Sequence, residues 1–171
     1  EALLKGAGVK PNDRFQVIDD ADPDAIEAAL WKKSKTSPVK TSGFMALGAP
    51  RAVTRLAMRS LTSANGGKTD TPIPLPKGAP YGRVEVNTAS CTVCLSCVGA
   101  CPAGALQDNP DAPQLLFKED ACLQCGICVA TCPEKVITLV PQFNLSDQAL
   151  ATELIVEDEP FHCTACGKPF G

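Results

Sequence analysis

The chain has 171 residues, and its hydrophobic fraction of 44 % is enough for a buried core in one ordinary domain or two small ones. Aromatic residues make up only 5 %, whereas there are 15 prolines and 13 glycines, so we expect many loops and some stabilisation other than side-chain packing. The net charge of −3 argues against a nucleic-acid partner, and the lack of any apolar run of about 18 residues argues against a membrane span.

Residues 1–61 have the pattern helix, strand, helix. We expect residues 1–7 to be the end of a helix that closes near Gly8, and residues 14–19 (RFQVID) to form a short strand. Asp22 and Pro23 supply an N-cap and a first-turn proline for a helix that runs to about Lys33. The pattern predicts a partial α/β region, the tail of a layer whose earlier strands lie outside this chain.

A second amphipathic helix is predicted over residues 51–61 (RAVTRLAMRSL), with a basic side and an apolar side. The basic side carries Arg51, Arg55 and Arg59, and the apolar side carries Val53, Leu56 and Met58. A solvated face is the ordinary interpretation of such a row. The alternative is a docking surface for an acidic partner or for the acidic cysteine-rich module that follows, since residues 81–140 carry 3 basic and 6 acidic residues.

Residues 62–80 contain four prolines and three glycines without periodicity, which is typical of a linker. The region 81–141 that follows is an internal repeat of a strand and a cysteine motif. We expect strands at residues 83–87, 115–118 and 136–140, and a turn at residues 109–111.

Eight of the ten cysteines lie in two copies of one frame, CTVCLSCVGACP at residues 91–102 and CLQCGICVATCP at residues 122–133. A disulfide framework rarely repeats such a spacing, and a zinc ribbon would need only four ligands in total. A 4Fe-4S cluster needs four thiolates, and Cys-x-x-Cys-x-x-Cys can wrap three of them around its corners. In this frame the fourth cysteine lies one helical turn further on and points towards the other cluster.

This region resembles the bacterial two-cluster ferredoxins, because both motifs, both closing prolines and the flanking strands are present over residues 81–141. The resemblance implies an α+β domain of short strands and short helices around two 4Fe-4S clusters. By the family's ligation, one cluster would be held by Cys91, Cys94, Cys97 and Cys132. The other would be held by Cys122, Cys125, Cys128 and Cys101.

The extension 142–171 carries a further pair, Cys163 and Cys166, in FHCTACGKPFG. Such a pair is typical of the first knuckle of a zinc ribbon or the start of a third cluster motif, and both need two more ligands. We expect these beyond Gly171, since a chain that begins with Glu1 reads as a piece of a longer protein. The alternative is two free thiols without a metal. His162 is next to the pair, but solvent exposure is its ordinary interpretation.

The arrangement as a whole is similar to the central part of long bacterial 4Fe-4S ferredoxin-type proteins. These are similar to iron–sulfur partners of molybdenum-containing oxidoreductases such as formate dehydrogenases. The resemblance implies a cytoplasmic electron-transfer component with a redox protein as its partner. The chain shows no nucleotide-binding loop or catalytic constellation, so whether it is part of an enzyme stays open. The alternative function is a structural, maturation or redox-sensing domain whose clusters fix an interaction surface.

Overall fold

The structure is a computed structural model that describes residues 1–10, 17–32, 38–40, 42–167 and 169–170. The chain divides into two compact units, Glu1–Thr69 and Asp70–Gly171. None of the helices in the described ranges has the length and hydrophobicity that crossing a bilayer requires.

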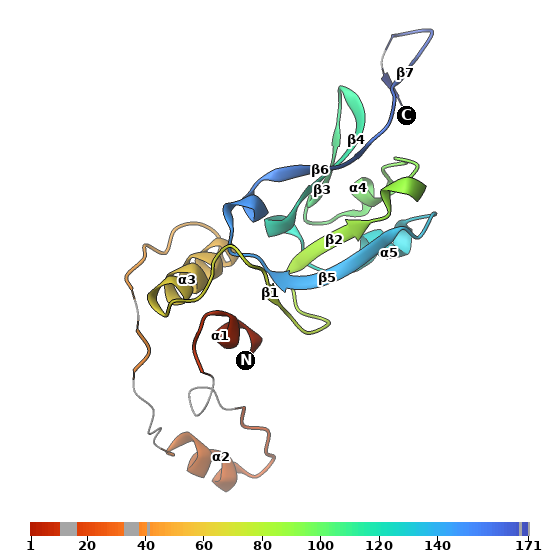
Figure 1. Ribbon diagram of the computed structural model, residues 1–171. Helices are drawn as coiled ribbons and strands as arrows, with labels where there is room; N and C mark the ends of the chain where they lie inside the picture. The colour runs from red at the N-terminus through yellow and green to blue at the C-terminus, as the bar shows by residue number, and fades with distance from the viewer. Residues whose placement is uncertain (11–16, 33–37, 41, 168, 171) are drawn as a thin grey trace. The chain divides into compact units, whose positions relative to one another are not determined.

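Among its described residues, the first unit contains three helices, α1 (Ala2–Gly6), α2 (Pro23–Leu30) and α3 (Pro50–Ala64) (Figure 1). The α2 helix begins as predicted, because the Asp22 carboxylate accepts a hydrogen bond from the Asp24 amide at 3.1 Å and proline occupies the first turn. It ends at Leu30, before the predicted end at Lys33, and Lys33 lies outside the described residues. The amphipathic helix predicted at residues 51–61 is confirmed as α3, which begins one residue earlier and ends three residues later.

The prediction of a strand at residues 14–19 is wrong for those of its residues that the structure describes. Residues 17–19 have no regular structure, and residues 14–16 lie outside the described residues. Val17 is 71 % exposed, and the described part of this unit contains only helices, so the segment has no strand to pair with. The described residues therefore do not build the expected α/β layer.

The end of α1 packs against the end of α3. Ala7 and Thr62 are fully buried, and a Cβ added to Gly67 would lie only 2.7 Å from the Thr62 methyl carbon. Asn65, which follows α3, donates hydrogen bonds to the Lys40 carbonyl oxygen at 2.9 Å and to the Leu61 carbonyl oxygen at 2.8 Å. These contacts make the helix ends, with their glycine turn, the best-packed part of the first unit.

The second unit contains two three-stranded antiparallel sheets. The first has the order β1-β5-β2, with β1 at Ile73–Pro74, β2 at Gly82–Val86 and β5 at Ile137–Phe143. The second has the order β3-β4-β6, with β3 at Leu106–Asn109, β4 at Ala112–Lys118 and β6 at Thr152–Glu157. A short hairpin of β7 (Phe161–His162) and β8 (Pro169–Phe170) follows. Helices and antiparallel sheets together make an α+β arrangement.

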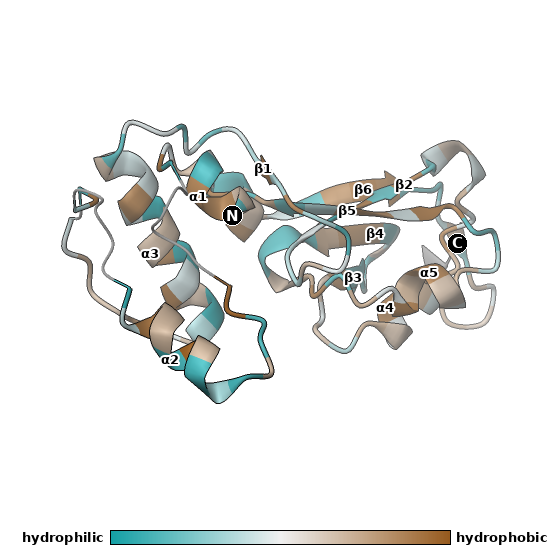
Figure 2. Ribbon diagram, turned by 90° about the horizontal axis from the view of Figure 1, so that it is seen from below, coloured by the Kyte–Doolittle hydropathy of each residue, from teal (hydrophilic) through white to brown (hydrophobic). Residues whose placement is uncertain are grey.

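Strand pairing follows the repeat in the sequence. The strand before the first cysteine motif, β2, pairs with the strand after the second motif, β5, while β3 after the first motif pairs with β4 before the second. Each motif ends in a short helix, and these helices, α4 (Ser96–Ala100) and α5 (Ile127–Thr131), contact each other. Figure 2 shows them side by side, in colours from white to brown that mark weakly polar and apolar residues. The pairing thus brings the two motifs together.

Three 3-10 turns complete this unit: η1 (Thr88–Ser90), η2 (Glu119–Ala121) and η3 (Asp147–Leu150). The η1 and η2 turns lead directly into the first cysteine of each motif. The core next to them contains Val84 of β2 and Leu115 and Phe117 of β4, none more than 1 % exposed. Alternate residues of β4 are buried, as expected for a strand with one face on the core.

Parts of the predicted linker at residues 62–80 belong to regular structure. Its first residues complete α3, and Ile73 of β1 pairs with Phe143 of β5 and is 5 % exposed. Four other strands of the described residues, β3, β6, β7 and β8, were not predicted at all. The β6 strand pairs along β4, so the extension after residue 141 takes part in the sheet of the cysteine-rich region.

Candidate metal centre

The two cysteine loops share an unusual backbone conformation. The residue before the second cysteine and the residue after it have positive φ in both loops: 48° at Val93 and 56° at Leu95, and 55° at Gln124 and 80° at Gly126. Three of these four residues are not glycine, and a β-branched valine adopts this conformation at a cost. The first motif thus keeps the same loop shape with Leu95 where the second has glycine. Strain repeated at equivalent positions points to a functional requirement on the loop.

The eight motif cysteines line two separate cavities. The two cavities are alike in size, as expected for a repeated site. One is lined by Cys91, Cys94, Cys97 and Cys132. The other is lined by Cys101, Cys122, Cys125 and Cys128. Each motif therefore contributes its first three cysteines to one cavity and its fourth to the other, and we call these sets the Cys91 quartet and the Cys122 quartet.

The rest of each cavity wall is mainly apolar. The Cys91 quartet lies among Val86, Val93, Leu95, Leu115, Val136 and Ile137. The Cys122 quartet lies among Val84, Ala105, Leu106, Phe117, Leu123 and Leu139. Such walls keep water from a bound group and lower the local dielectric constant, which affects the redox potential of a metal centre.

Burial and hydrogen bonds divide the thiols into two kinds. Burial raises the pKa of Cys97 to about 11 and also raises the pKa of Cys128. The hydrogen bond with the Ser96 hydroxyl lowers the pKa of the exposed Cys94. Burial acts on Cys101 as well, but the backbone amides that follow it outweigh burial and lower its pKa. One of these amides, that of Ala105, donates to Cys101 Sγ at 3.3 Å.

The cysteines surround cavities and do not converge on one point. Among the described residues, no three His, Cys, Asp or Glu side chains lie close enough together to hold a single metal ion. A mononuclear zinc site needs its four ligands within about 2.3 Å of one ion. Four thiols around a wider cavity are instead the donor set that a polynuclear iron–sulfur cluster requires.

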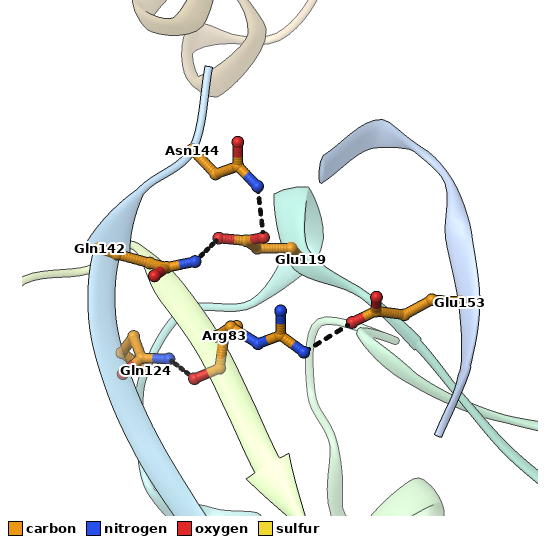
Figure 3. Close-up of polar contacts among 6 residues, drawn as sticks. All are labelled: Arg83, Glu119, Gln124, Gln142, Asn144 and Glu153. Carbon is orange, nitrogen blue, oxygen red and sulfur yellow. Dashed lines mark hydrogen bonds and ion pairs between the residues drawn. The ribbon is translucent and has the colours of Figure 1, made fainter. Parts of the chain in front are cut away.

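Sequence reasoning missed a polar cluster behind the second motif (Figure 3). Glu119, only 8 % exposed, accepts hydrogen bonds from Gln142 at 2.7 Å and from Asn144 at 2.9 Å. Its backbone carbonyl oxygen accepts a hydrogen bond from the Cys122 amide at 3.0 Å. Glu119 therefore links two segments: its carboxylate contacts the end of β5, and its carbonyl contacts the start of the second cysteine loop. Gln142 and Asn144 follow Glu119 by more than 20 positions, and no local pattern relates them to it.

Cys163 and Cys166 lie apart from both cavities, in the turn between β7 and β8. The Gly167 amide donates to the Cys163 carbonyl oxygen at 2.8 Å, and Gly167 has φ of 70°, so the backbone turns tightly after the pair. The Ala165 backbone amide lowers the pKa of Cys163. His162 is exposed, in β7. In the part of the chain that the structure describes, this pair has no third ligand.

The arginine row of α3 is not uniformly solvated. Arg55 is only 8 % exposed, whereas Leu56, assigned to the apolar side, is 37 % exposed. Arg51 and Arg59 are half-buried. The ordinary interpretation of this row as a solvated face is therefore wrong for Arg55, whose long aliphatic stem allows burial of most of its side chain.

Comparison with known proteins locates the same region. Residues 90–137 match the family model of the 4Fe-4S dicluster domain. A ferredoxin-type protein NapH of Haemophilus influenzae is 31 % identical over 87 residues, which cover 43 % of this chain and 30 % of that protein. The polyferredoxin-like subunit of an aliphatic sulfonate oxidoreductase of Pyrococcus furiosus is 42 % identical over 40 residues, which cover 23 % of each chain. The chain thus spans less than a third of the length of either relative.

Proposed function

Because the chain contains a ferredoxin-type domain over residues 90–137, we propose that its two cysteine quartets each hold one 4Fe-4S cluster and that the chain transfers electrons. The proposed ligands are Cys91, Cys94, Cys97 and Cys132 for one cluster, and Cys122, Cys125, Cys128 and Cys101 for the other. When bound, such a cluster accepts and releases single electrons at a potential that the protein sets. The observation that carries the proposal is the division of eight cysteines into two crossed quartets around equal cavities.

The residues of the two sites suit this role by position as well as chemistry. Cys97 of the Cys91 quartet lies close enough to Cys128 of the Cys122 quartet for their charges to interact. These two cysteines are the second residues of α4 and α5, and the two helices contact each other. Adjacent sites favour electron exchange between them. The mainly apolar walls of both cavities limit the access of water to the sites.

We further propose that the chain is an electron-carrying module of a larger redox protein or complex. The ferredoxin-type and oxidoreductase names of its relatives support a redox partner. A molybdenum-containing oxidoreductase such as formate dehydrogenase is the partner class suggested by the sequence resemblance. Zinc or a third cluster at Cys163 and Cys166 would require two ligands from outside the described residues.

Electron transfer can be separated from a structural, maturation or redox-sensing role by kinetics. The anaerobically purified protein, reduced by photochemically reduced deazaflavin, should return to its oxidised spectrum when oxidised cytochrome c is added, and the cytochrome should be reduced in the same time. Variants that lose either quartet should transfer fewer electrons per chain. Clusters that assemble but cannot be reduced, or that are destroyed by one reduction cycle, would contradict the electron-transfer role and favour the alternative.

A further inference from the structure

Gln124 stands between the first two cysteines of the second motif, and its side-chain nitrogen has two acceptors within reach. Nε2 lies 2.8 Å from the Arg83 carbonyl oxygen and 3.5 Å from Cys122 Sγ, a distance that suits the larger sulfur atom (Figure 3 shows the first contact). A primary amide nitrogen carries two hydrogens, so one can be donated to each acceptor.

The contact with Arg83 fixes which end of the amide faces the sulfur. A backbone carbonyl oxygen can only accept, so the nitrogen of Gln124, and not its oxygen, must lie against β2. Gly82 leaves the room for this, since a Cβ there would lie 2.7 Å from Gln124 Cδ and would also meet the Val140 carbonyl oxygen. The β2 strand and the cysteine loop therefore hold the amide in one orientation.

This arrangement has a cost that packing alone would not require. Within the described residues, Gln124 Oε1 is buried and has no hydrogen-bond partner. An unpaired buried acceptor is unfavourable, and an apolar residue at this position would avoid it. The first motif avoids this cost, because its residue equivalent to Gln124 is the apolar Val93, which is 4 % exposed and lines the other cavity. The polar residue in the second motif thus points to a use for its N–H groups.

The first motif has a side-chain donor of another kind at another place. Ser96 Oγ lies 3.5 Å from Cys94 Sγ, and once Cys94 is a thiolate the hydroxyl can donate to it. The equivalent residue in the second motif is Ile127, which cannot. Each quartet therefore has its own side-chain contact to sulfur, from Gln124 to Cys122 in one and between Ser96 and Cys94 in the other.

We propose that Gln124 is a positioning residue whose side-chain amide donates a hydrogen bond to Cys122 Sγ and raises the reduction potential of the Cys122-quartet site alone. This inference rests on the proposed function. Reduction adds negative charge to a cluster and its thiolates, and a donor to a ligand sulfur stabilises the more negative form more strongly. Removing the donor should therefore make reduction harder at that site.

The test is a redox titration followed by EPR, on the unaltered protein, Gln124→Leu, Ser96→Ala and the double variant, each with its iron and sulfide measured. We expect Gln124→Leu to shift one midpoint potential to a more negative value, Ser96→Ala to shift the other, and the double variant to shift both. Because the two single variants address different quartets, they serve as controls for each other. Gln124→Leu that retains its iron and moves neither midpoint, or moves both equally, would overturn the inference.

A second measurement tests the inference even if Gln124→Leu loses its iron. Pulsed EPR of the reduced, unaltered protein with ¹⁵N in its glutamine side chains should show a nitrogen coupled to one cluster and not to the other. No such coupling would overturn the inference while leaving the clusters in place. If the unaltered protein assembles no cluster at all, the proposed function itself fails, and the inference fails with it.

Discussion

At the scale of single residues, the second cysteine loop depends on polar groups that the cysteine spacing does not reveal. Gln124 orients its amide against β2, and Glu119 accepts two amide hydrogen bonds in a buried position (Figure 3). The cysteines could be assigned from spacing because their chemistry is local. Gln124 and Glu119 could not, since their partners Arg83, Gln142 and Asn144 are far away in the sequence.

Glu119→Ala should destabilise the iron-loaded protein by about 1–3 kcal/mol, because it leaves one buried amide donor (Asn144) and one half-buried amide donor (Gln142) without an acceptor. Glu153→Ala is the matched control, as it also removes a carboxylate, but one that is 46 % exposed in its ion pair with Arg83. The control should cost less than about 1 kcal/mol. The measurement is anaerobic urea unfolding, followed by loss of cluster absorbance and far-UV circular dichroism. Equal costs for both variants would contradict a supporting role for the buried carboxylate.

Glu119→Gln should lie between the unaltered protein and Glu119→Ala. The Gln142 amide can turn round to accept a hydrogen bond from the new amide. The oxygen of Asn144 is already held by the Ser146 amide at 3.0 Å and hydroxyl at 2.8 Å, so Asn144 can turn only by losing these bonds. A Gln variant as unstable as the Ala variant would show that the negative charge itself is required.

Cys163 and Cys166 should behave as free thiols in this chain. In the iron-loaded protein, a short anaerobic treatment with iodoacetamide should modify these two cysteines and leave the eight quartet cysteines unmodified. Cys163 should react first, because the Ala165 amide lowers its pKa and so increases its thiolate fraction at neutral pH. Mass spectrometry of peptides measures this directly. Protection of the pair to the same degree as the quartets would show that it holds a metal here.

At the scale of elements, strand pairing between the two halves of the repeat produces the crossed quartets. Because β2 pairs with β5 and β3 with β4, the chain after each motif runs beside the strand that leads into the other motif. Cys101, at the end of α4, consequently lines the cavity of the Cys122 quartet, and Cys132, at the end of α5, lines the cavity of the Cys91 quartet. The proposed crossing of ligands would therefore join the two halves.

The crossing predicts which serine variants should resemble each other. Cys101→Ser should give the same residual EPR spectrum and redox midpoint as Cys125→Ser, because both damage the Cys122 quartet and leave the other intact. Cys132→Ser should likewise match Cys94→Ser. This comparison needs no prior assignment of either signal. If Cys101→Ser matched Cys94→Ser instead, each motif would hold its own cluster and the crossed assignment would be wrong.

The elements that could be predicted are those with local signals. The N-cap at Asp22 indicated α2, and alternation indicated β2. The β6 strand gave too little local signal, since only two of its six residues are even half-buried and its partner β4 lies far back in the chain. The strand predicted from residue 14 had a suitable composition, but its described residues have no pairing partner. Pairing between distant segments decided each of these outcomes.

At the scale of the whole molecule, two compact units differ in what they contain. The unit from Asp70 onwards holds both sheets, both quartets and the hairpin with Cys163, whereas the described residues before it have helices as their only regular structure. The match to the family model covers residues 90–137. The chain spans less than a third of the length of either relative. The proposed electron-transfer module therefore lies within the second unit.

The most direct test of this account is the iron and acid-labile sulfide content of the anaerobically purified protein, measured together with its reduction by dithionite. Two clusters of four irons each predict a brown protein with about eight irons and about eight sulfides per chain, whose visible absorbance is bleached on reduction. A colourless anaerobic preparation that contains stoichiometric zinc and no sulfide would contradict the assignment of both quartets.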